Sequence, residues 1–287
     1  MIGSILKVPL FLFMLLASTW TFADQHNDIV WGVNVSPPFH IWQGEYENAG
    51  FCDTLVNTFE RELPTLSQTK RKLPSRRITK LMRSNQHVCF PCLIKGSNYN
   101  KDFIFSEVTH AYPPHGVITS ASNAQKLIKR FGEPLSFTQL AQSNYRFAQP
   151  IERRYGELQP IVEDYLIPSD HFQEVSGEGA HMNLMAMIAT NRIDYTLDYK
   201  MLMTYFYRTE GQSDPDFEPL VFIPIKENQN TVILGAVGCS NNRWGQHAIN
   251  NMNRVLNQVK SDSDFLQSLD LWLGPDRPRP DFSDERQ

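Results

Sequence analysis

The sequence is poor in the motifs that carry enzyme chemistry. It contains no glycine-rich phosphate-binding loop, no serine–histidine or cysteine–histidine arrangement of recognisable spacing, and no cluster of metal ligands. Its eight histidines are scattered along 287 residues, and we interpret each as a surface or satisfied core residue. These absences predict a protein that is not an enzyme and holds no metal or cofactor.

A basic surface for nucleic acid is also missing. The formal net charge is −4 and the sequence pI is about 6.1. Nucleic-acid-binding domains usually carry a clustered basic excess. The one basic cluster comprises Lys70, Arg71 and Lys72 with Arg76 and Arg77, and we interpret it as a solvated strand edge and turn. We therefore expect no nucleic-acid partner.

Long apolar runs are absent beyond the N-terminus. Lys7 precedes an apolar stretch from Val8 to Ala17, and Phe22-Ala23 forms a small-residue boundary. This pattern is typical of a secretory signal peptide, here 1–23, with cleavage near Ala23. An uncleaved anchor is the alternative, but no second apolar stretch of roughly 20 residues follows. No cysteine lies at the cleavage point, so we expect a soluble periplasmic protein without a lipid anchor.

Four cysteines remain after the predicted signal peptide, and they do not form a metal or redox motif. Cys89 and Cys92 have the spacing of a redox pair, yet they lie in an apolar strand pattern rather than at the start of a helix. Cys52 and Cys239 do not supply the second close pair that a structural zinc site needs. We interpret all four as structural, and export permits disulfides.

Short apolar strands alternate with amphipathic helices along the chain. A strand at 29–35 is followed by a helix that begins after Gly50 and ends at Pro64, a helix at 77–84 and a strand at 87–94. This order predicts a parallel sheet in an α/β fold. Later helices are expected at 136–142, 158–166, 182–190, 202–207 and 248–259, and later strands at 145–149, 172–175, 193–197, 220–225 and 231–237. The polar, proline-rich segment 275–287 is expected to be a disordered tail.

Several strings, in this order, resemble the type II periplasmic binding proteins, in particular the family 3 extracellular solute-binding proteins that include amino-acid receptors. They are WGVNVSPPF, GFCDTLVNTFERELP, RRITKLMRSNQHVCF, FIFSEV, ATNRIDYTLDY and AINNMNRVLNQV. The resemblance implies two α/β lobes joined by two chain crossings, with a ligand cleft between them. It implies a first lobe at 24–118 and 225–274 and a second lobe at 119–224. A poorly characterised branch, with a cysteine in the third strand and an Arg-Tyr-Gly turn in the second lobe, is the most similar.

The resemblance also implies where a ligand would bind. In amino-acid receptors an arginine after the third strand pairs with the ligand carboxylate, and a carboxylate of the second lobe pairs with its ammonium group. Here the first position falls on Tyr99, and the second falls on Asp198 or Tyr199, depending on register. The loss of the arginine removes a bidentate clamp.

Other cations can take that role. Arg77 stands at a predicted helix start, and Arg153 and Arg154 precede the helix that contains Leu158, where backbone N–H groups also face an anion. The alternative is that these arginines are surface residues, with Arg154 paired to Glu152 or Glu157. The predicted ligand-binding residues are Phe39, Arg77, Tyr99, Arg154, Tyr155 and Asp198.

The implied lobes also suggest a disulfide. Cys239 ends an apolar strand of the returning segment, beside the strand that carries Cys89 and Cys92. We expect one bridge from Cys239 to one of that pair, and the alternation of the strand favours Cys89.

The function that the resemblance implies is capture of a small polar molecule, anionic or zwitterionic, by hinge closure. Its partner would be an ABC-type permease or a membrane sensor, and the protein would act as a monomer. Two alternatives remain: a protein that docks on a sensor without any ligand, and a dehydratase-like enzyme on the same fold.

Overall fold

A computed structural model describes residues 28–96, 102–151, 153–211 and 214–279. The predicted signal peptide and Tyr99 lie outside these residues, as does the end of the predicted tail from Pro280 onward. Within the described residues, no helix is long and apolar enough to cross a membrane.

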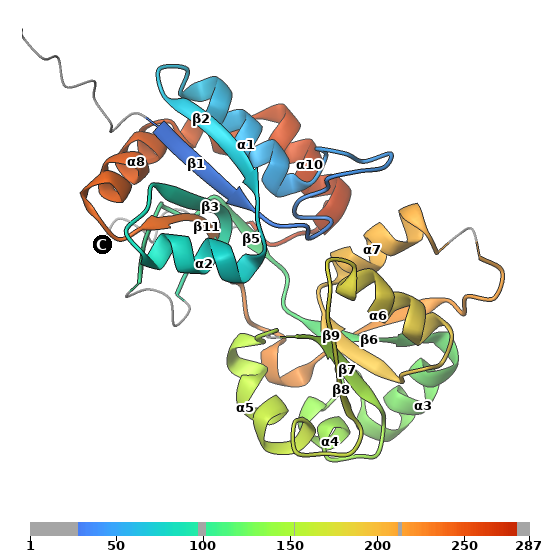
Figure 1. The fold of residues 1–287 in the computed structure, drawn as a ribbon. Coiled ribbons are helices and arrows are strands. Elements are labelled where there is room, and N and C mark those ends of the chain that lie inside the picture. Colours follow the sequence, from blue (N-terminus) through green and yellow to red (C-terminus); the bar gives the residue numbers. More distant parts are fainter. Residues whose placement is uncertain (1–27, 97–101, 152, 212–213, 280–287) are drawn as a thin grey trace, which may run out of the picture.

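The chain forms two lobes, each built on its own sheet (Figure 1). The first sheet has the order β2-β1-β3-β11-β4, and β5 also pairs with β11. The second has the order β10-β6-β9-β7-β8. The strands are β1 (Asp28–Val33), β2 (Ser67–Lys72), β3 (Val88–Ile94), β4 (Phe103–Phe105), β5 (His110–Tyr112), β6 (Gly116–Ser120), β7 (Phe147–Pro150), β8 (Phe172–Val175), β9 (Tyr195–Asp198), β10 (Leu220–Pro224) and β11 (Ile233–Ser240).

The first lobe contains both the beginning and the end of the described chain. Its helices are α1 (Phe51–Glu62), α2 (Ser75–Arg83), α8 (Arg243–Arg254), α9 (Leu256–Ser261) and α10 (Ser263–Leu273). The helices of the second lobe are α3 (Ala121–Phe131), α4 (Phe137–Ala141), α5 (Gln159–Ile161), α6 (Ala180–Ala189) and α7 (Lys200–Thr209). The chain crosses between the lobes twice, from β5 into β6 and from β10 into β11. Because β6 begins at Gly116, the first crossing lies before the expected boundary at 118.

The predicted parallel order is only part of the first sheet. β2, β1 and β3 run parallel, but the returning strand β11 pairs antiparallel with β3, β4 and β5. In the second sheet, β7 is parallel to β8 and β9, whereas β6 is antiparallel to β9 and β10. Strands that return directly from the opposite lobe have no crossover helix to set them parallel.

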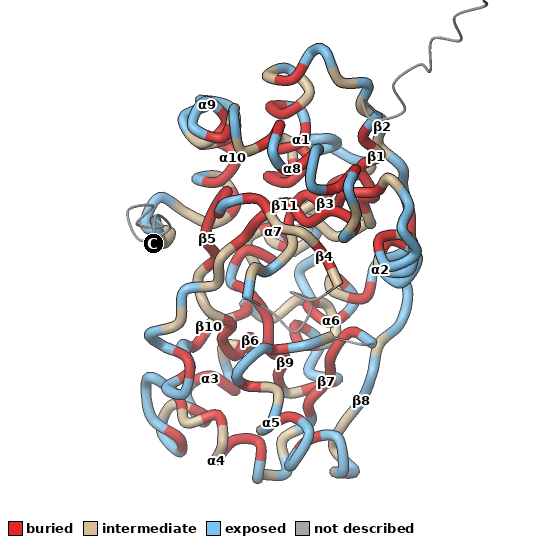
Figure 2. The backbone as a smooth tube through the Cα atoms, turned by 90° about the vertical axis from the view of Figure 1, so that its left-hand side faces the viewer, coloured by how far each residue is buried: buried red, intermediate tan, exposed pale blue. Residues whose placement is uncertain are grey.

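Buried apolar residues line both sheets, and exposed residues lie on the outer helix faces (Figure 2). α1 shows the principle: Phe51, Leu55 and Phe59 follow helical spacing on one buried face. Pro64 then follows within two residues of the helix end. The basic residues Arg71 and Lys72 are exposed on the edge strand β2, as expected for a solvated strand edge.

Several helical segments differ from the expectation, among them α3, which was not predicted. The segment 158–166 is an irregular succession of short helical turns, and the helix expected at 248–259 is divided at Val255 into α8 and α9. α10 was not predicted. Its first turn is capped by the Asp262 side chain, which accepts a hydrogen bond from the Phe265 backbone N–H at 3.0 Å.

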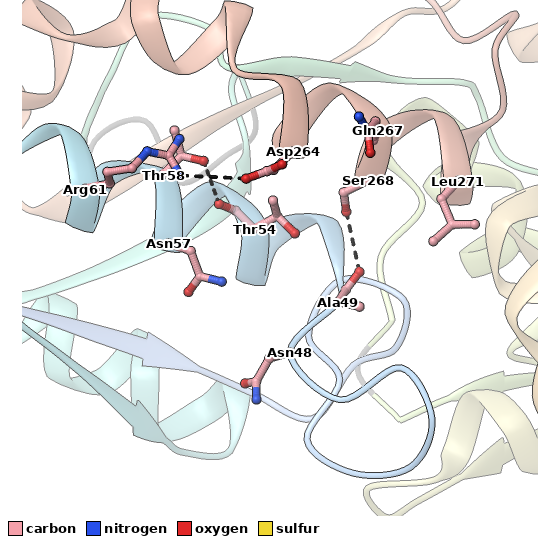
Figure 3. A pocket seen from close by; sticks show the side chains of 10 residues that line it. All are labelled: Asn48, Ala49, Thr54, Asn57, Thr58, Arg61, Asp264, Gln267, Ser268 and Leu271. Carbon is pink, nitrogen blue, oxygen red and sulfur yellow. Dashed lines mark hydrogen bonds and ion pairs between the residues drawn. The ribbon is translucent and has the colours of Figure 1, made fainter.

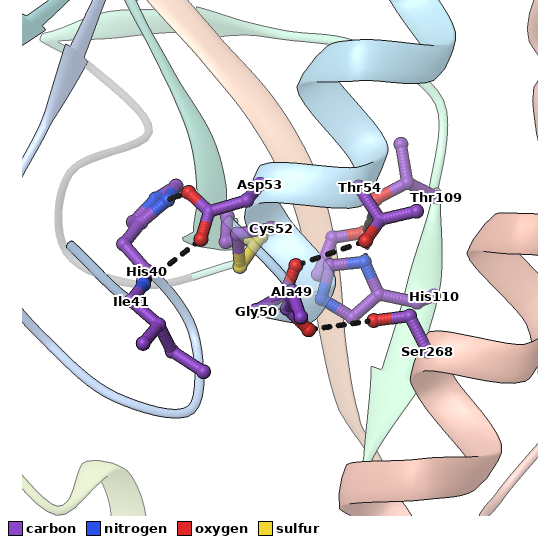
Figure 4. The surroundings of a disulfide bond; sticks show 12 residues. His40, Ile41, Ala49, Gly50, Cys52, Asp53, Thr54, Thr109, His110 and Ser268 are labelled. Atoms are coloured by element: carbon purple, nitrogen blue, oxygen red, sulfur yellow. Dashed lines mark hydrogen bonds and ion pairs between the residues drawn. A yellow bond between two sulfur atoms is a disulfide. The ribbon is translucent and has the colours of Figure 1, made fainter. Parts of the chain in front are cut away.

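Two disulfides lie within the first lobe. Cys89 on β3 is bonded to Cys239, which stands directly opposite on β11. This is the pairing that strand alternation favoured. A second bond joins Cys52 to Cys92 and was not predicted. Figure 4 shows Cys52 in the first turn of α1, beside Asp53, which accepts hydrogen bonds from the Ile41 backbone and the His40 ring. All four cysteines are buried.

Buried histidines at the first crossing give the fold a pH dependence. Burial lowers the pKa of His110 and that of His115 from 6.5 to about 3, so both rings are neutral when folded. The unfolded chain binds these protons below about pH 6.5. Their contribution to stability is therefore complete above that pH and is lost as the pH falls toward 3.

We expect the free energy of unfolding to fall by about 2 kcal/mol per histidine between pH 7.5 and pH 5. Urea denaturation at the two pH values measures this difference. In His110→Phe the difference should shrink by about half, whatever the stability of that variant at pH 7.5. An unchanged pH difference in the variant would show that His110 is protonated in the folded protein.

Candidate functional site

Three polar side chains converge at the carboxyl ends of adjacent parallel strands in the second lobe. Asp198 is the last residue of β9, Arg153 follows β7 by three residues, and His181 lies in the first turn of α6, after β8. Arg153 Nη2 donates to Asp198 Oδ1 at 2.6 Å, and His181 Nδ1 lies 2.9 Å from Asp198 Oδ2. Ligands in open α/β sheets bind outside this edge.

The Asp198 carboxylate is completely buried, and both of its oxygens have hydrogen-bond partners. Oδ1 also accepts the Tyr199 backbone N–H at 2.9 Å. Burial by itself would raise the pKa of Asp198, but the charges of Arg153 and His181 outweigh it and hold the pKa well below its ordinary value. Asp198 is therefore ionised, and the Arg153 guanidinium and the His181 ring hold its carboxylate in place.

Arg153 keeps donors that no described residue uses. Its side chain is 21% exposed, and its Nε is buried without a hydrogen-bond partner. Nη2 also approaches His115 Nε2 at 3.4 Å. Because His115 is neutral, that nitrogen can accept a hydrogen bond. The guanidinium lies 5.4 Å above the Tyr199 ring and 5.9 Å from the Tyr155 ring, which fixes its plane.

An aromatic wall connects this cluster to the first lobe. Phe39, in the loop after β1, lies 5.9 Å from Tyr112 and 6.2 Å from Tyr199. Tyr112 and His115, at the two ends of the first crossing, stack on Tyr199 at 5.6 Å and 4.1 Å. The hydroxyls of Tyr112 and Tyr155 are buried without a partner. The arrangement places a cation and unsatisfied hydroxyls against rings from both lobes, as small-molecule sites generally do.

The lobes also meet away from this wall. Lys72 at the end of β2 lies 3.5 Å from Glu178 in the loop before α6, and both side chains are largely exposed. On the other side, Tyr205 of α7 packs 5.5 Å from Trp272 of α10. An exposed ion pair contributes little to stability, so it can open and re-form as the lobes move.

The predicted ligand residues fall into three groups: those in the interlobe cluster, those away from it, and Tyr99, which lies outside the described residues. Phe39, Tyr155 and Asp198 belong to the interlobe cluster. Arg77 is exposed in the first turn of α2. Arg154 is 65% exposed and pairs with Glu163 at 2.8 Å, a partner other than the two considered from the sequence. The cluster does not include Arg77 or Arg154.

Sequence reasoning missed Arg153, His181 and Tyr112 as members of the cluster. Arg153 was noted beside Arg154, but nothing local distinguishes the two. His181 and Tyr112 carried no motif. For Arg153 and His181 the usable signal was their position after a predicted strand, because the carboxyl ends of neighbouring parallel strands meet at one edge. Tyr112 gave no such signal, because it lies on the short strand β5, which was not predicted.

A separate pocket of about 530 Å³ lies on the first lobe and is not part of this cluster (Figure 3). Its lining comes from α1, the loop before it and α10. Arg61 at its edge pairs with Asp264, and Ser268 donates to the Ala49 carbonyl. Arg61 and Ser268 thus have partners within the lobe.

Comparison with known proteins identifies the fold. No family model matches the sequence, and no curated protein matches it. Among solved structures, a histidine kinase sensor domain similar to periplasmic binding proteins aligns with a TM-score of 0.66 at 12% identity, over 90% of this chain and 100% of the other. An L-arginine-bound substrate-binding protein of an amino-acid ABC transporter from Streptococcus pneumoniae aligns with a TM-score of 0.62 at 11% identity, over 89% and 97%.

A third structure is that of an ancestral binding protein. The ancestral amino-acid-binding protein AncCDT-1, a precursor of cyclohexadienyl dehydratase, aligns with a TM-score of 0.62 at 13% identity, over 86% of this chain and 95% of the other. The chain therefore has a two-lobed α/β fold of the binding-protein class. More particularly, it has the type II periplasmic binding protein fold, which amino-acid-binding proteins of ABC transporters and a sensor domain share.

Proposed function

We propose that the protein is a periplasmic solute-binding protein that captures a small anionic or zwitterionic molecule between its lobes for a membrane transporter. The observation that carries this proposal is the Arg153 guanidinium. It has an unpartnered buried Nε, and it stacks over Tyr199 beside rings of the first lobe. A buried guanidinium N–H without an acceptor costs free energy, and a ligand that accepts its hydrogen bond removes that cost.

The position of the cluster supports capture by closure. Phe39 belongs to the first lobe, whereas Arg153 and Asp198 belong to the second. A molecule that contacts both would bind the closed arrangement better than the open one and would shift the population toward it. The two crossings beside Tyr112 and Ile233 are the segments that would flex.

A ligand-sensing role at a membrane sensor is the second candidate. It is favoured by the likeness to the histidine kinase sensor domain, whose whole length this chain matches. Both roles require the same interlobe ligand, so the first experiment does not depend on the choice between them.

The experiment is a thermal-shift screen of the protein without its predicted signal peptide against amino acids, organic acids, polyamines and short peptides. A true ligand at about 100 times its Kd adds about 2.7 kcal/mol of stability, which for a chain of this size is a rise of roughly 5–10 °C in melting temperature. A ligand with this effect should also reduce the radius of gyration in solution scattering. If no compound in these classes raises the melting temperature, the docking protein without a ligand becomes the better account.

A further inference from the structure

The cluster offers a ligand a charged donor but no charged acceptor. Among the described residues, Asp53 and Asp198 are the buried carboxylates. Asp198 Oδ1 accepts from Arg153 and from the Tyr199 backbone, and Oδ2 is bonded to His181. Asp53 in the first lobe is occupied in the same way, by the His40 ring at 2.6 Å and the Ile41 backbone at 2.8 Å.

Two exposed carboxylates near the cluster do not supply the missing charged acceptor. Glu174 at the end of β8 is exposed and lies 3.4 Å from Gln149 Nε2, and Glu178 is 71% exposed and faces Lys72. A pair formed with an exposed carboxylate contributes little, because water and salt screen it. A ligand ammonium group carried into the cluster would therefore lose its hydration without finding a buried anion.

The groups that are left without a partner can donate hydrogen bonds to the carboxylate of an acid. Arg153 Nε and the hydroxyls of Tyr112 and Tyr155 are buried and unsatisfied. A carboxylate can accept from each of these three donors, and a hydrogen bond to a charged donor is about twice as strong as a neutral one. The neutral His115 ring adds no competing charge beside the guanidinium.

We infer that the protein's own Arg153 occupies the place that a ligand ammonium would need, so that the site selects small carboxylic acids that lack an ammonium group. This inference rests on the proposed function and narrows its ligand class. Arg153 then has two effects: it binds the acid, and by neutralising Asp198 it excludes the corresponding amino acid.

The test compares matched pairs of probes that differ in one amino group. We would use succinate and L-aspartate, glutarate and L-glutamate, 3-phenylpropionate and L-phenylalanine, and 5-guanidinovalerate and L-arginine, titrated calorimetrically into the wild-type protein. In the pair that fits the cleft, the acid should bind at least roughly tenfold more tightly than the amino acid, because the amino acid buries an unpaired charge.

A variant that removes the Arg153 guanidinium tests whether this residue causes the preference for the acid. In Arg153→Met, Asp198 Oδ1 loses its guanidinium partner and becomes an acceptor for a ligand ammonium. The preference for the acid should disappear or reverse. Arg154→Met is the matched control, since Arg154 is exposed and paired with Glu163, and it should keep the wild-type preference.

Each outcome decides something. If the amino acid of the fitting pair binds wild-type protein as tightly as its acid, the inference is wrong while the proposed capture function stands. If no member of any pair binds at 10-millimolar concentration while a compound of another class does, the inference is again wrong. If nothing binds in the pairs or in the screen, both fail together. The wild-type comparison needs no variant, so it holds even where Arg153→Met does not fold.

Discussion

Arg153→Met is expected to lower the free energy of unfolding by about 3–5 kcal/mol, which is the usual cost of removing one partner of a buried ion pair. The variant leaves the Asp198 carboxylate buried with His181 as its one remaining side-chain partner. Chemical denaturation at pH 7.5 measures the loss.

The double variant Arg153→Met with Asp198→Asn separates charge from packing. Asparagine removes the buried charge and keeps the shape of the side chain, so the double variant should recover most of the lost stability. Arg154→Met again serves as control and should change stability by less than about 0.5 kcal/mol, as expected for an exposed ion pair. A loss below about 1 kcal/mol in Arg153→Met would mean that Asp198 is solvated and that the cluster is not a buried site.

The second large effect is expected at the disulfides. The Cys89–Cys239 bond closes a loop of 150 residues and the Cys52–Cys92 bond a loop of 40. The chain-entropy model assigns roughly 5 kcal/mol to the longer loop and roughly 4 kcal/mol to the shorter one. Replacing both cysteines of a pair with alanine should therefore cost more for Cys89 and Cys239.

The longer bond also ties the returning strand β11 to β3, so its loss should loosen the first lobe where the two ends of the chain meet. Denaturation curves of the two double-alanine variants give the order, and peptide mapping under non-reducing conditions confirms which cysteines are joined. Free thiols in the mapped protein, or a cost below about 1 kcal/mol for the Cys89 and Cys239 variant, would contradict this account of the lobe.

Sequence patterns predicted the helices and strands that are determined by residues close to one another in the chain. α1 begins after Gly50 and ends just before Pro64 because apolar spacing and proline chemistry act within a few residues. The strand of Cys89 was equally clear. α10 was missed although Asp262 caps it and its buried residues Phe265, Leu269 and Trp272 follow helical spacing, so the local signal for this helix was present in the sequence.

The site was harder to predict because its contacts are non-local. Arg153 and Arg154 are neighbours of one chemical type. Arg153 binds Asp198, which lies 45 residues further on, and Arg154 binds Glu163 at the surface. The family resemblance put the second-lobe position on Asp198 or Tyr199, depending on register, and the structure brings both residues into the cluster: Asp198 binds Arg153, and the Tyr199 ring stacks with Tyr112 and with His115.

The central claim is that a ligand is held at Arg153 between the lobes, and the most direct test is calorimetric titration of Arg153→Ala and Arg154→Ala with a ligand found in the screen. We predict that Arg153→Ala weakens binding by roughly 2–4 kcal/mol, because it removes a desolvated charged donor, and that Arg154→Ala stays within about twofold of the wild type. Equal affinities of Arg153→Ala and the wild type, or a loss confined to Arg154→Ala, would contradict the account and move the ligand away from the Arg153 cluster.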